Sequence, residues 1–300
     1  MIVASTFAEC RRLGSGVVGL VPTMGFLHEG HLSHIARSAT ADDTTIVSLF
    51  VNPTQFDDPS DLERYPRAFE RDRELAFSAG ADVLFVPDVS EIYPGEPLVS
   101  VVVDEVTDHM EGSRRPGHFQ GVATVVAKLF AGIQPDTAYF GRKDAQQVAV
   151  VTTMARQLRF PVRIEPGSTV READGLALSS RNVFLSDDDR RRALGISAGL
   201  FSVADLIDAG EADASVIERA CRDRLGDIDV EYVQLADQAK AQPLDTLDRP
   251  AFLAVAGTVG ATRLIDNVAI DLIDGRWQVD RGDRLQERSM LYGERDAAGR

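Results

Sequence analysis

The first half of the sequence alternates short runs of β-branched and apolar residues with longer segments of helical periodicity. Residues 17–21 predict a buried strand, and residues 31–41 follow with apolar side chains recurring on one side of a helix. This alternation is typical of a parallel sheet wrapped by helices. We therefore predict an α/β fold that begins with a Rossmann-like, doubly wound parallel sheet.

The same alternation continues to about residue 165, where Pro166-Gly167 interrupts it and marks a domain boundary. The further strands predicted in this half are residues 45–51, 81–86, 99–103, 137–140 and 162–165, and the further helices are residues 61–79, 121–133 and 145–158.

A smaller α+β domain is predicted beyond this boundary. Its helices are expected from Ser186 through Leu206 and at residues 214–225, and its strands at residues 230–235, 251–256 and 263–270. From Asp274 onward the apolar spacing is too irregular to demand a packed core. The predicted domains are therefore residues 1–168, a smaller C-terminal lid of residues 169–275, and a polar tail of residues 276–300 that need not be ordered.

The charge of the chain limits the classes of function that it can have. The formal net charge is -15, whereas a broad nucleic-acid-binding surface needs clustered Lys and Arg, so we expect no nucleic-acid partner. The two cysteines, Cys10 and Cys221, form no CxxC pair and predict neither a disulfide framework nor a thiolate metal site. Because no segment approaches the ~18 to 20 apolar residues of a membrane span, we expect a soluble, cytoplasmic protein.

The densest chemical signal is residues 24–31 (MGFLHEGH), where a predicted strand turns into a helix. Ligands of parallel-sheet folds bind beyond the carboxyl ends of the strands. His28 and His31, three residues apart, would present two imidazoles at the helix N-terminus, where N–H groups and the helix dipole favour an anion. Gly25 and Gly30 would let a bulky ligand approach the backbone.

Other interpretations of these histidines stay open at this point. A histidine pair near a helix start is often surface decoration or part of a core, and His28, His31 and His34 form a trio that a metal ion could bind. The spacing of three residues differs from the spacing of four in the metalloprotease helix, which argues against a zinc site of that class.

Two further segments have side chains suited to phosphate. The hydroxyls of Ser179 and Ser180 lie beside Arg181, and this combination supplies hydrogen-bond donors and a fixed cation. Lys143 follows the predicted strand 137–140 and is a point charge for phosphate. The neighbouring Asp144 could hold a ribose hydroxyl or a magnesium-bound water.

Together these segments resemble the pantothenate synthetase family, one of the HxGH nucleotidyltransferases, which are related in fold to class I aminoacyl-tRNA synthetases. The resemblance covers residues 17–270. It is carried by PTMGFLHEGH (22–31), FVNPTQF (50–56), YPR (65–67), RPGHFQGV (115–122), FGRKDAQQ (140–147), VREADGLALSSRN (170–182) and DNVAI (266–270).

The resemblance implies a role for each matching residue. His31 would be the proton donor, with His28, Lys143 and Arg181 as the other catalytic residues, and Gln55 and Gln147 would bind pantoate. Asp72 and Asp144 are the candidate magnesium ligands. The implied ATP contacts are Met24, Gly25, Phe26, Leu27, His28, Glu29, Gly30, His31, Gly141, Arg142, Lys143, Asp144, Val170, Leu178, Ser179, Ser180 and Arg181.

The implied reaction is the ATP-dependent condensation of (R)-pantoate with β-alanine to pantothenate through a pantoyl adenylate, releasing AMP and pyrophosphate. ATP is a substrate, Mg²⁺ accompanies it, and the family is usually homodimeric. Family members often have other residues at the positions of Arg142 and Leu178, and an acidic triplet after YPR where this chain has Glu70-Arg71-Asp72. These differences leave the magnesium ligands open. The alternatives are an HxGH adenylyltransferase that stops after AMP transfer and a nonenzymatic nucleotide- or metal-binding protein.

Overall fold

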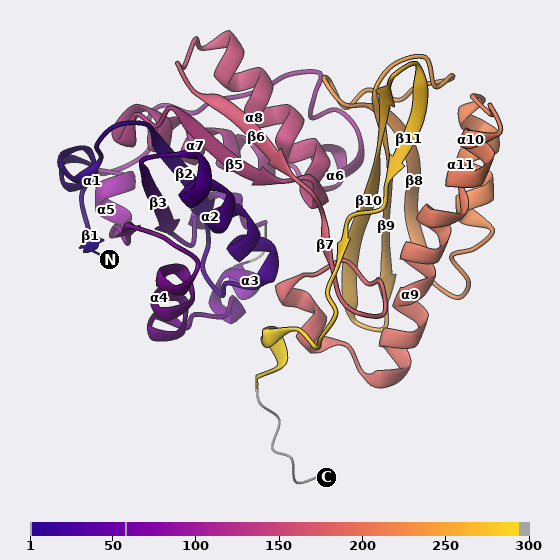
Figure 1. The fold of residues 1–300 in the computed structure, drawn as a ribbon, viewed down its shortest axis with the longest axis horizontal. Coiled ribbons are helices and arrows are strands. Elements are labelled where there is room, and N and C mark those ends of the chain that lie inside the picture. The colour runs from indigo at the N-terminus through magenta and orange to yellow at the C-terminus, as the bar shows by residue number, and fades with distance from the viewer. Residues whose placement is uncertain (1, 58, 294–300) are drawn as a thin grey trace, which may run out of the picture. The chain divides into compact units, whose positions relative to one another are not determined.

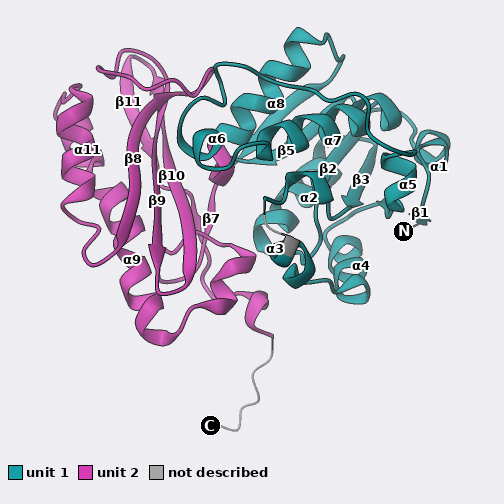
Figure 2. Cartoon of the chain, turned by 180° about the vertical axis from the view of Figure 1, so that it is seen from behind, with its two compact units in different colours: residues 1–141, 146–167 teal, residues 142–145, 168–300 magenta. Residues whose placement is uncertain are grey.

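A computed structural model describes residues 2–57 and 59–293 of the 300-residue chain (Figure 1). The chain divides into two compact units (Figure 2). The first contains Met1–Gly141 and Gln146–Gly167, and the second contains Arg142–Ala145 and Ser168–Arg300.

The first unit is built on a six-stranded parallel sheet. Its strand order is β1-β4-β3-β2-β5-β6, so that β3 and β4 lie on one side of β2, and β5 and β6 lie on the other. This arrangement confirms the predicted doubly wound sheet. The strands are β1 (Ile2–Ala4), β2 (Val18–Thr23), β3 (Thr44–Leu49), β4 (Val83–Phe85), β5 (Thr137–Gly141) and β6 (Arg163–Gly167).

Helices pack against this sheet because its strands are apolar on both faces. In α2, the fully buried Ile35 lies in one cluster with Val21 of β2 and Val47 of β3. The helical elements of this unit are α1 (Phe7–Leu13), α2 (Glu29–Ala41), η1 (Pro53–Gln55), α3 (Pro59–Arg64), α4 (Phe69–Ser78), α5 (Val89–Ile92), α6 (Met110–Arg114), α7 (His118–Ile133) and α8 (Ala145–Gln157). The short η2 (Arg142–Asp144) between β5 and α8 belongs to the second unit.

Two elements of this unit differ from the sequence prediction. The single helix expected at 61–79 is two helices, α3 and α4, because Pro66 in the YPR motif lacks an amide hydrogen and restrains the residue before it. The strand expected at 99–103 is not formed. Its Val101 amide donates to the Thr124 hydroxyl at 2.9 Å instead of to a neighbouring strand.

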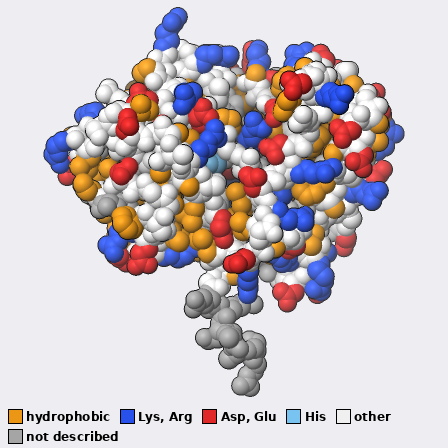
Figure 3. All heavy atoms as spheres, in the orientation of Figure 1, with side chains coloured by type: hydrophobic (Ala, Val, Ile, Leu, Met, Phe, Trp, Pro, Cys, Tyr) orange, Lys and Arg blue, Asp and Glu red, His pale blue; other side chains and the backbone are white. Residues whose placement is uncertain are grey.

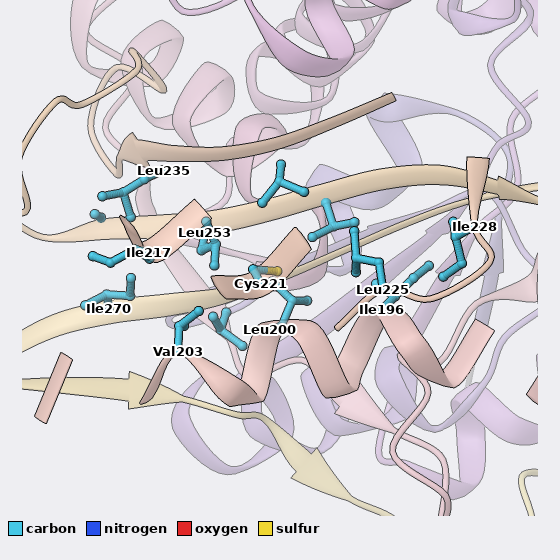
Figure 4. Packing of buried hydrophobic residues seen from close by; sticks show 14 of the residues in the cluster. Ile196, Leu200, Val203, Ile217, Cys221, Leu225, Ile228, Leu235, Leu253 and Ile270 are labelled. Carbon is cyan, nitrogen blue, oxygen red and sulfur yellow. The ribbon is translucent and has the colours of Figure 1, made fainter. Parts of the chain in front are cut away.

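The second unit has a four-stranded antiparallel sheet with the order β11-β10-β9-β8. Helices α9 and α11 pack on it, and Leu200, Ile217, Cys221, Leu253 and Ile270 meet in the core between them (Figure 4). This confirms the predicted α+β character. The elements are β7 (Val170–Arg171), η3 (Ser180–Phe184), α9 (Asp187–Ser202), α10 (Ala204–Asp208), α11 (Ala214–Arg222), β8 (Asp229–Asp237), β9 (Ala251–Val259), β10 (Thr262–Ile273), β11 (Arg276–Asp280), β12 (Asp283–Arg284) and η4 (Met290–Tyr292).

The expected polar tail contains ordered elements. The strand β11 pairs with β10, β12 pairs in parallel with β7, and η4 follows. Backbone pairing contributes much of their order, and only a few apolar side chains, such as Trp277, Val279 and Leu291, are packed or buried, which leaves little apolar periodicity in the sequence. Residues 294–300 of the predicted tail lie outside the described residues.

The surface carries charges of both signs. Basic and acidic side chains are interspersed over the face shown in Figure 3, and acidic residues outnumber basic ones by 47 to 32 in the chain. Among the described helices, none has the length and apolar character needed to cross a membrane.

Candidate active site

The carboxyl edge of the parallel sheet carries three of the motif segments. Residues 24–31 follow β2, residues 50–56 follow β3, and Gly141 ends β5. Because parallel strands end at the same edge of a sheet, the fold brings these segments to the edge where such folds bind ligands.

The turn before the histidines has an unusual backbone that Asp72 stabilises. Gly25 has a φ of +86° and Phe26 a φ of +52°, a left-handed conformation that is unfavourable for a large side chain. Asp72, on α4, is 2% exposed, and its two oxygens accept hydrogen bonds from the Phe26 and Leu27 amides, each at 2.7 Å. Arg71 adds a 2.8 Å bond to the Leu27 carbonyl. The structure therefore gives Asp72 a role in shaping the turn.

The rings of the two motif histidines lie close together at the start of α2, tilted by 32° to each other. His28 is the N-cap residue, Glu29 and Gly30 begin the helix, and the ring centroids of His28 and His31 are 4.0 Å apart. The His28 amide donates to Nδ1 of His31 at 3.3 Å. Because Nδ1 of His31 accepts, its Nε2 carries the hydrogen in the neutral ring and can donate it to an oxygen.

Gln55 lies beside the same turn. Its Nε2 donates to the Met24 sulfur at 3.1 Å, and its Oε1 accepts from the Asn52 side chain at 3.0 Å. Asn52 is 1% exposed and also accepts from the Tyr93 hydroxyl at 2.8 Å. The structure thus brings the predicted residues Met24 and Gln55 together. It also identifies Asn52 as a positioning residue that the sequence analysis did not single out.

A glycine of α7 permits this placement of Gln55. A methyl group at Gly121 would lie 2.4 Å from the Thr54 carbonyl oxygen and 2.8 Å from the Gln55 amide nitrogen. Gly121 therefore allows α7 to pack directly on the backbone of η1. His118, one turn earlier on α7, contacts the Gln55 carbonyl at 2.9 Å, and burial lowers its pKa.

The third histidine of the sequence trio, His34, has a different environment from the other two. It is buried, and its ring packs against Gly141 and Gly167, where a methyl group on Gly167 would lie 2.3 Å from the ring. Burial, together with the nearby Arg37 charge, lowers the pKa of His34 to about 4, so its ring is neutral at pH 7. The environment of His34 therefore agrees with the interpretation of this histidine as part of a packed core.

The neighbouring glutamines of α8 have separate environments. Gln146 is buried, and its side chain accepts from the Glu111 amide at 3.0 Å and donates to the Val106 and His109 carbonyls, both at 2.9 Å. Gln147, the predicted pantoate ligand, is partly exposed.

In the second unit, Asp266 and Asn267 of the DNVAI motif organise two other motifs. Asp266 forms a bidentate pair with Arg171 at 2.6 and 3.1 Å, and both side chains are buried. The Asn267 side chain donates to the carbonyls of Arg142 at 2.9 Å and Lys143 at 2.7 Å. These bonds fix the backbone that presents the Lys143 side chain.

The side chains around Lys143 have partners of their own. Arg142 forms a 2.8 Å ion pair with Asp271. The Lys143 ammonium lies 3.7 Å from an Asp144 oxygen, and the Lys143 side chain keeps 19% exposure. Arg142 therefore contributes to the fold of this unit, and Lys143 retains solvent access.

The serine-arginine turn is formed by η3 and the residues before it. The Ser179 hydroxyl caps the turn by accepting from the Arg181 amide at 3.3 Å, and Ser180 is partly exposed and Arg181 exposed. The Leu178 amide donates to the Val170 carbonyl at 2.9 Å, and both side chains are buried. The hydroxyls and the guanidinium thus lie at the surface above an apolar base.

The carboxylate of Asp72 is engaged by the backbone of the turn. Both Asp72 oxygens accept backbone amides, and the described part of the chain contains no cluster of three His, Cys, Asp or Glu side chains that could hold a metal ion. Metal binding by Asp72 and Asp144 stays a prediction.

Comparison with known proteins identifies the family. The family model described as pantoate-beta-alanine ligase matches residues 2–269. The chain belongs to the pantoate-β-alanine ligase family. Members of this family join pantoate to β-alanine, and the chain is a ligase that forms pantothenate.

Relatives and solved structures of the pantoate-β-alanine ligase family match nearly the whole chain. The pantothenate synthetase of Moorella thermoacetica is 48% identical over 275 residues, which are 91% of this chain and 97% of the relative. A crystal structure of the Thermus thermophilus enzyme has a TM-score of 0.84 at 44% identity and covers 89% of this chain and 98% of that one. The Francisella tularensis ligase, complexed with β-γ ATP and β-alanine, has a TM-score of 0.72 at 33% identity, with 89% and 97% covered.

Proposed function

We propose that the chain uses ATP to form pantothenate in two steps, through a pantoyl adenylate. The observation that carries this proposal is the histidine pair at the N-terminus of α2, where the His28 amide donates to Nδ1 of His31 and so places the hydrogen of the neutral ring on Nε2, at a helix end that favours phosphate. The complex of the Francisella tularensis relative with β-γ ATP and β-alanine supports ATP and β-alanine as substrates.

In the first step, a carboxylate oxygen of (R)-pantoate attacks the α-phosphorus of ATP, and the bond to pyrophosphate breaks. Negative charge builds on the phosphate oxygens. Donors that are fixed in advance lower this barrier most effectively, because they need not reorganise during the reaction. We assign this role to His31 and His28 and, from the family resemblance, to Lys143, Arg181 and the hydroxyls of Ser179 and Ser180.

In the second step, the neutral amine of β-alanine attacks the acyl carbon, the bond to AMP breaks, and the amine loses a proton. The enzyme then has mainly to align the amine and the acyl carbon. We propose that Gln55 and Gln147 hold pantoate. The amide of Gln55 is already oriented by Met24 and Asn52, and an amide both donates and accepts, which suits a carboxylate and two hydroxyls.

Gly121→Ala is expected to weaken pantoate binding. The added methyl group would displace the backbone of η1, because a Cβ at this position lies 2.4 Å from the Thr54 carbonyl oxygen. Overpacking costs about 1–3 kcal/mol, so we expect the KM for pantoate to rise about tenfold. Steady-state kinetics with pantoate varied at saturating ATP would measure this change.

Gly132→Ala is the matched control, because it lies on the same helix but faces the Phe7 ring, 2.3 Å from its Cβ position, and not η1. We expect this variant to lose stability and to keep the KM for pantoate. Equal effects of the two variants on that KM would contradict the assignment of Gln55.

The test of the proposed function is the release of AMP and pyrophosphate from Mg-ATP and (R)-pantoate, with and without β-alanine. Sustained AMP release that requires β-alanine, together with pantothenate formation, is the expected result. The alternative is an adenylyltransferase that stops after AMP transfer, and it would accumulate an adenylylated product without an amine. That outcome would contradict the second step.

Three further features are proposed from the family resemblance alone. They are Mg²⁺ as the companion of ATP, a homodimer, and a cytoplasmic location. Sedimentation analysis of the purified chain would test the dimer directly.

A further inference from the structure

The C-terminal segment contacts the serine-arginine turn within the second unit. The 3-10 turn η4, which contains Tyr292, packs against η3, which contains Ser180 and Arg181. The segment lies beyond residue 269, where the match to the family model ends. Its role is therefore not accounted for by the family model.

The contact is centred on a buried carboxylate, Glu172, which is 3% exposed. One of its oxygens accepts from the Asn182 side chain at 2.7 Å and from the Tyr292 hydroxyl at 2.8 Å, and the other accepts from Arg190 at 2.7 Å. Arg190 also donates to the Tyr292 hydroxyl at 2.6 Å. Tyr292 thus bridges both members of the ion pair that Glu172 forms with Arg190.

Asn182 connects this network to the turn. It directly follows Arg181, it is 2% exposed, and its side chain also donates to the Ala177 carbonyl at 3.0 Å. The backbone amide of Asn182 donates to the Ser179 carbonyl at 3.0 Å. The conformation of residues 179–182 is therefore coupled to the position of the Glu172 carboxylate.

The end of the segment is itself well held. Leu291 and Ser289 are buried, and the Ser289 hydroxyl accepts from the Leu291 amide at 3.2 Å. The guanidinium of Arg288 lies 5.0 Å from the centre of the Tyr292 ring, and that of Arg190 lies 5.6 Å from it. These contacts fix the ring and direct its hydroxyl to Glu172.

We propose that residues 289–293 act as a brace that holds the serine-arginine turn in its ATP-contacting conformation, and that Tyr292 is the positioning residue of this brace. The inference rests on the ATP contacts proposed above for Ser179, Ser180 and Arg181. The brace holds the turn in place before ATP binds, so that less ordering is required on binding. Its loss raises the KM for ATP and leaves the binding of pantoate and β-alanine nearly unchanged.

The test compares Tyr292→Phe, which removes only the hydroxyl, with a chain that ends at Arg288 and lacks the brace. The expected increase in the KM for ATP is about 3- to 10-fold for Tyr292→Phe, as for the loss of one or two hydrogen bonds, and larger for the shortened chain. At saturating ATP, we expect the kcat of Tyr292→Phe to stay within about twofold of the wild-type value.

Two matched controls isolate the brace. A chain that ends at Gly293 keeps η4, and Tyr232→Phe removes a tyrosine hydroxyl from β8 of the same unit. Both are expected to keep the wild-type KM for ATP. Arg181→Ala tests the underlying assignment separately, because an unchanged KM for ATP and kcat in that variant would refute the proposed ATP contact itself.

An unchanged KM for ATP in Tyr292→Phe would refute the proposed role of the brace. This result would leave the proposed function intact if the wild type is active and Arg181→Ala has the expected effect. A uniform rise of all three substrate KM values with a lower melting temperature would also refute the role of the brace, because that pattern indicates general loss of structure. If the chain ending at Arg288 does not fold, Tyr292→Phe decides the question alone.

Discussion

His31→Ala is expected to lower kcat by about 10²–10³-fold, the loss typical of removing one fixed donor to a developing negative charge. The His28 amide orients the His31 ring through a 3.3 Å bond to Nδ1, which places the hydrogen of the neutral ring on Nε2. We propose that Nε2 donates this hydrogen to a phosphate oxygen during the reaction. Alanine removes that hydrogen and leaves the helix N-terminus in place. Initial rates of AMP release at saturating ATP, pantoate and β-alanine would measure the effect.

The control for this variant is His109→Ala. His109 is the N-cap of α6 and lies outside the turn of the motif histidines. We expect it to retain kcat within about twofold, because it contributes no donor to the reacting phosphate in the proposed mechanism. A His31→Ala variant with wild-type kcat would refute the role of this histidine as a donor to the phosphate.

Asp266→Ala is expected to lower the free energy of unfolding of the second unit by about 3–5 kcal/mol, because it leaves the buried Arg171 guanidinium without its charge partner. Arg171 is 1% exposed and donates two hydrogen bonds to Asp266, at 2.6 and 3.1 Å. Urea unfolding followed by the fluorescence of Trp277, the single tryptophan of the chain, reports on this unit because Trp277 lies in β11.

Asp248→Ala is the matched control, since it removes an exposed ion pair with Arg249 in the same unit. Exposed pairs contribute little to stability, so its urea midpoint should match that of the wild type. If Asp266→Ala unfolded at the same midpoint as Asp248→Ala, the buried pair would not be a main support of this unit.

The sequence predicted the sheet of the first unit because its strands are buried on both faces and have continuous apolar runs. It did not predict β1 or β11. Ile2–Ala4 is too short for a clear pattern. Arg276–Asp280 pairs with β10 and packs only Trp277 and Val279 against the core, which is too few apolar residues for a clear strand signal. The break between α3 and α4 does have a signal in the sequence, because Pro66 lacks an amide hydrogen and interrupts the apolar pattern of residues 61–79.

In the candidate site, the motifs of the sequence single out His28, His31 and Gln55, because their chemistry is visible in the residue type, and their roles stay predictions. The role of Asp72 was not visible, because it depends on contacts with amides 45 and 46 residues away in the chain. Such a contact leaves no periodic signal in a single sequence, and an acidic side chain near a phosphate motif is equally suited to a metal ion.

The neighbouring positions of Asp266 and Asn267 on β10 have a consequence for insertions and deletions. Successive side chains of a strand point to opposite faces. Asp266 therefore accepts from Arg171 on one face, and Asn267 donates to the backbone carbonyls of Arg142 and Lys143 on the other. A slip of one residue in the β9–β10 pairing would exchange the two faces and disconnect both motifs at once. The length of the hairpin turn at Gly260 therefore determines the positions of both motifs, although this turn contacts no substrate in the proposed mechanism.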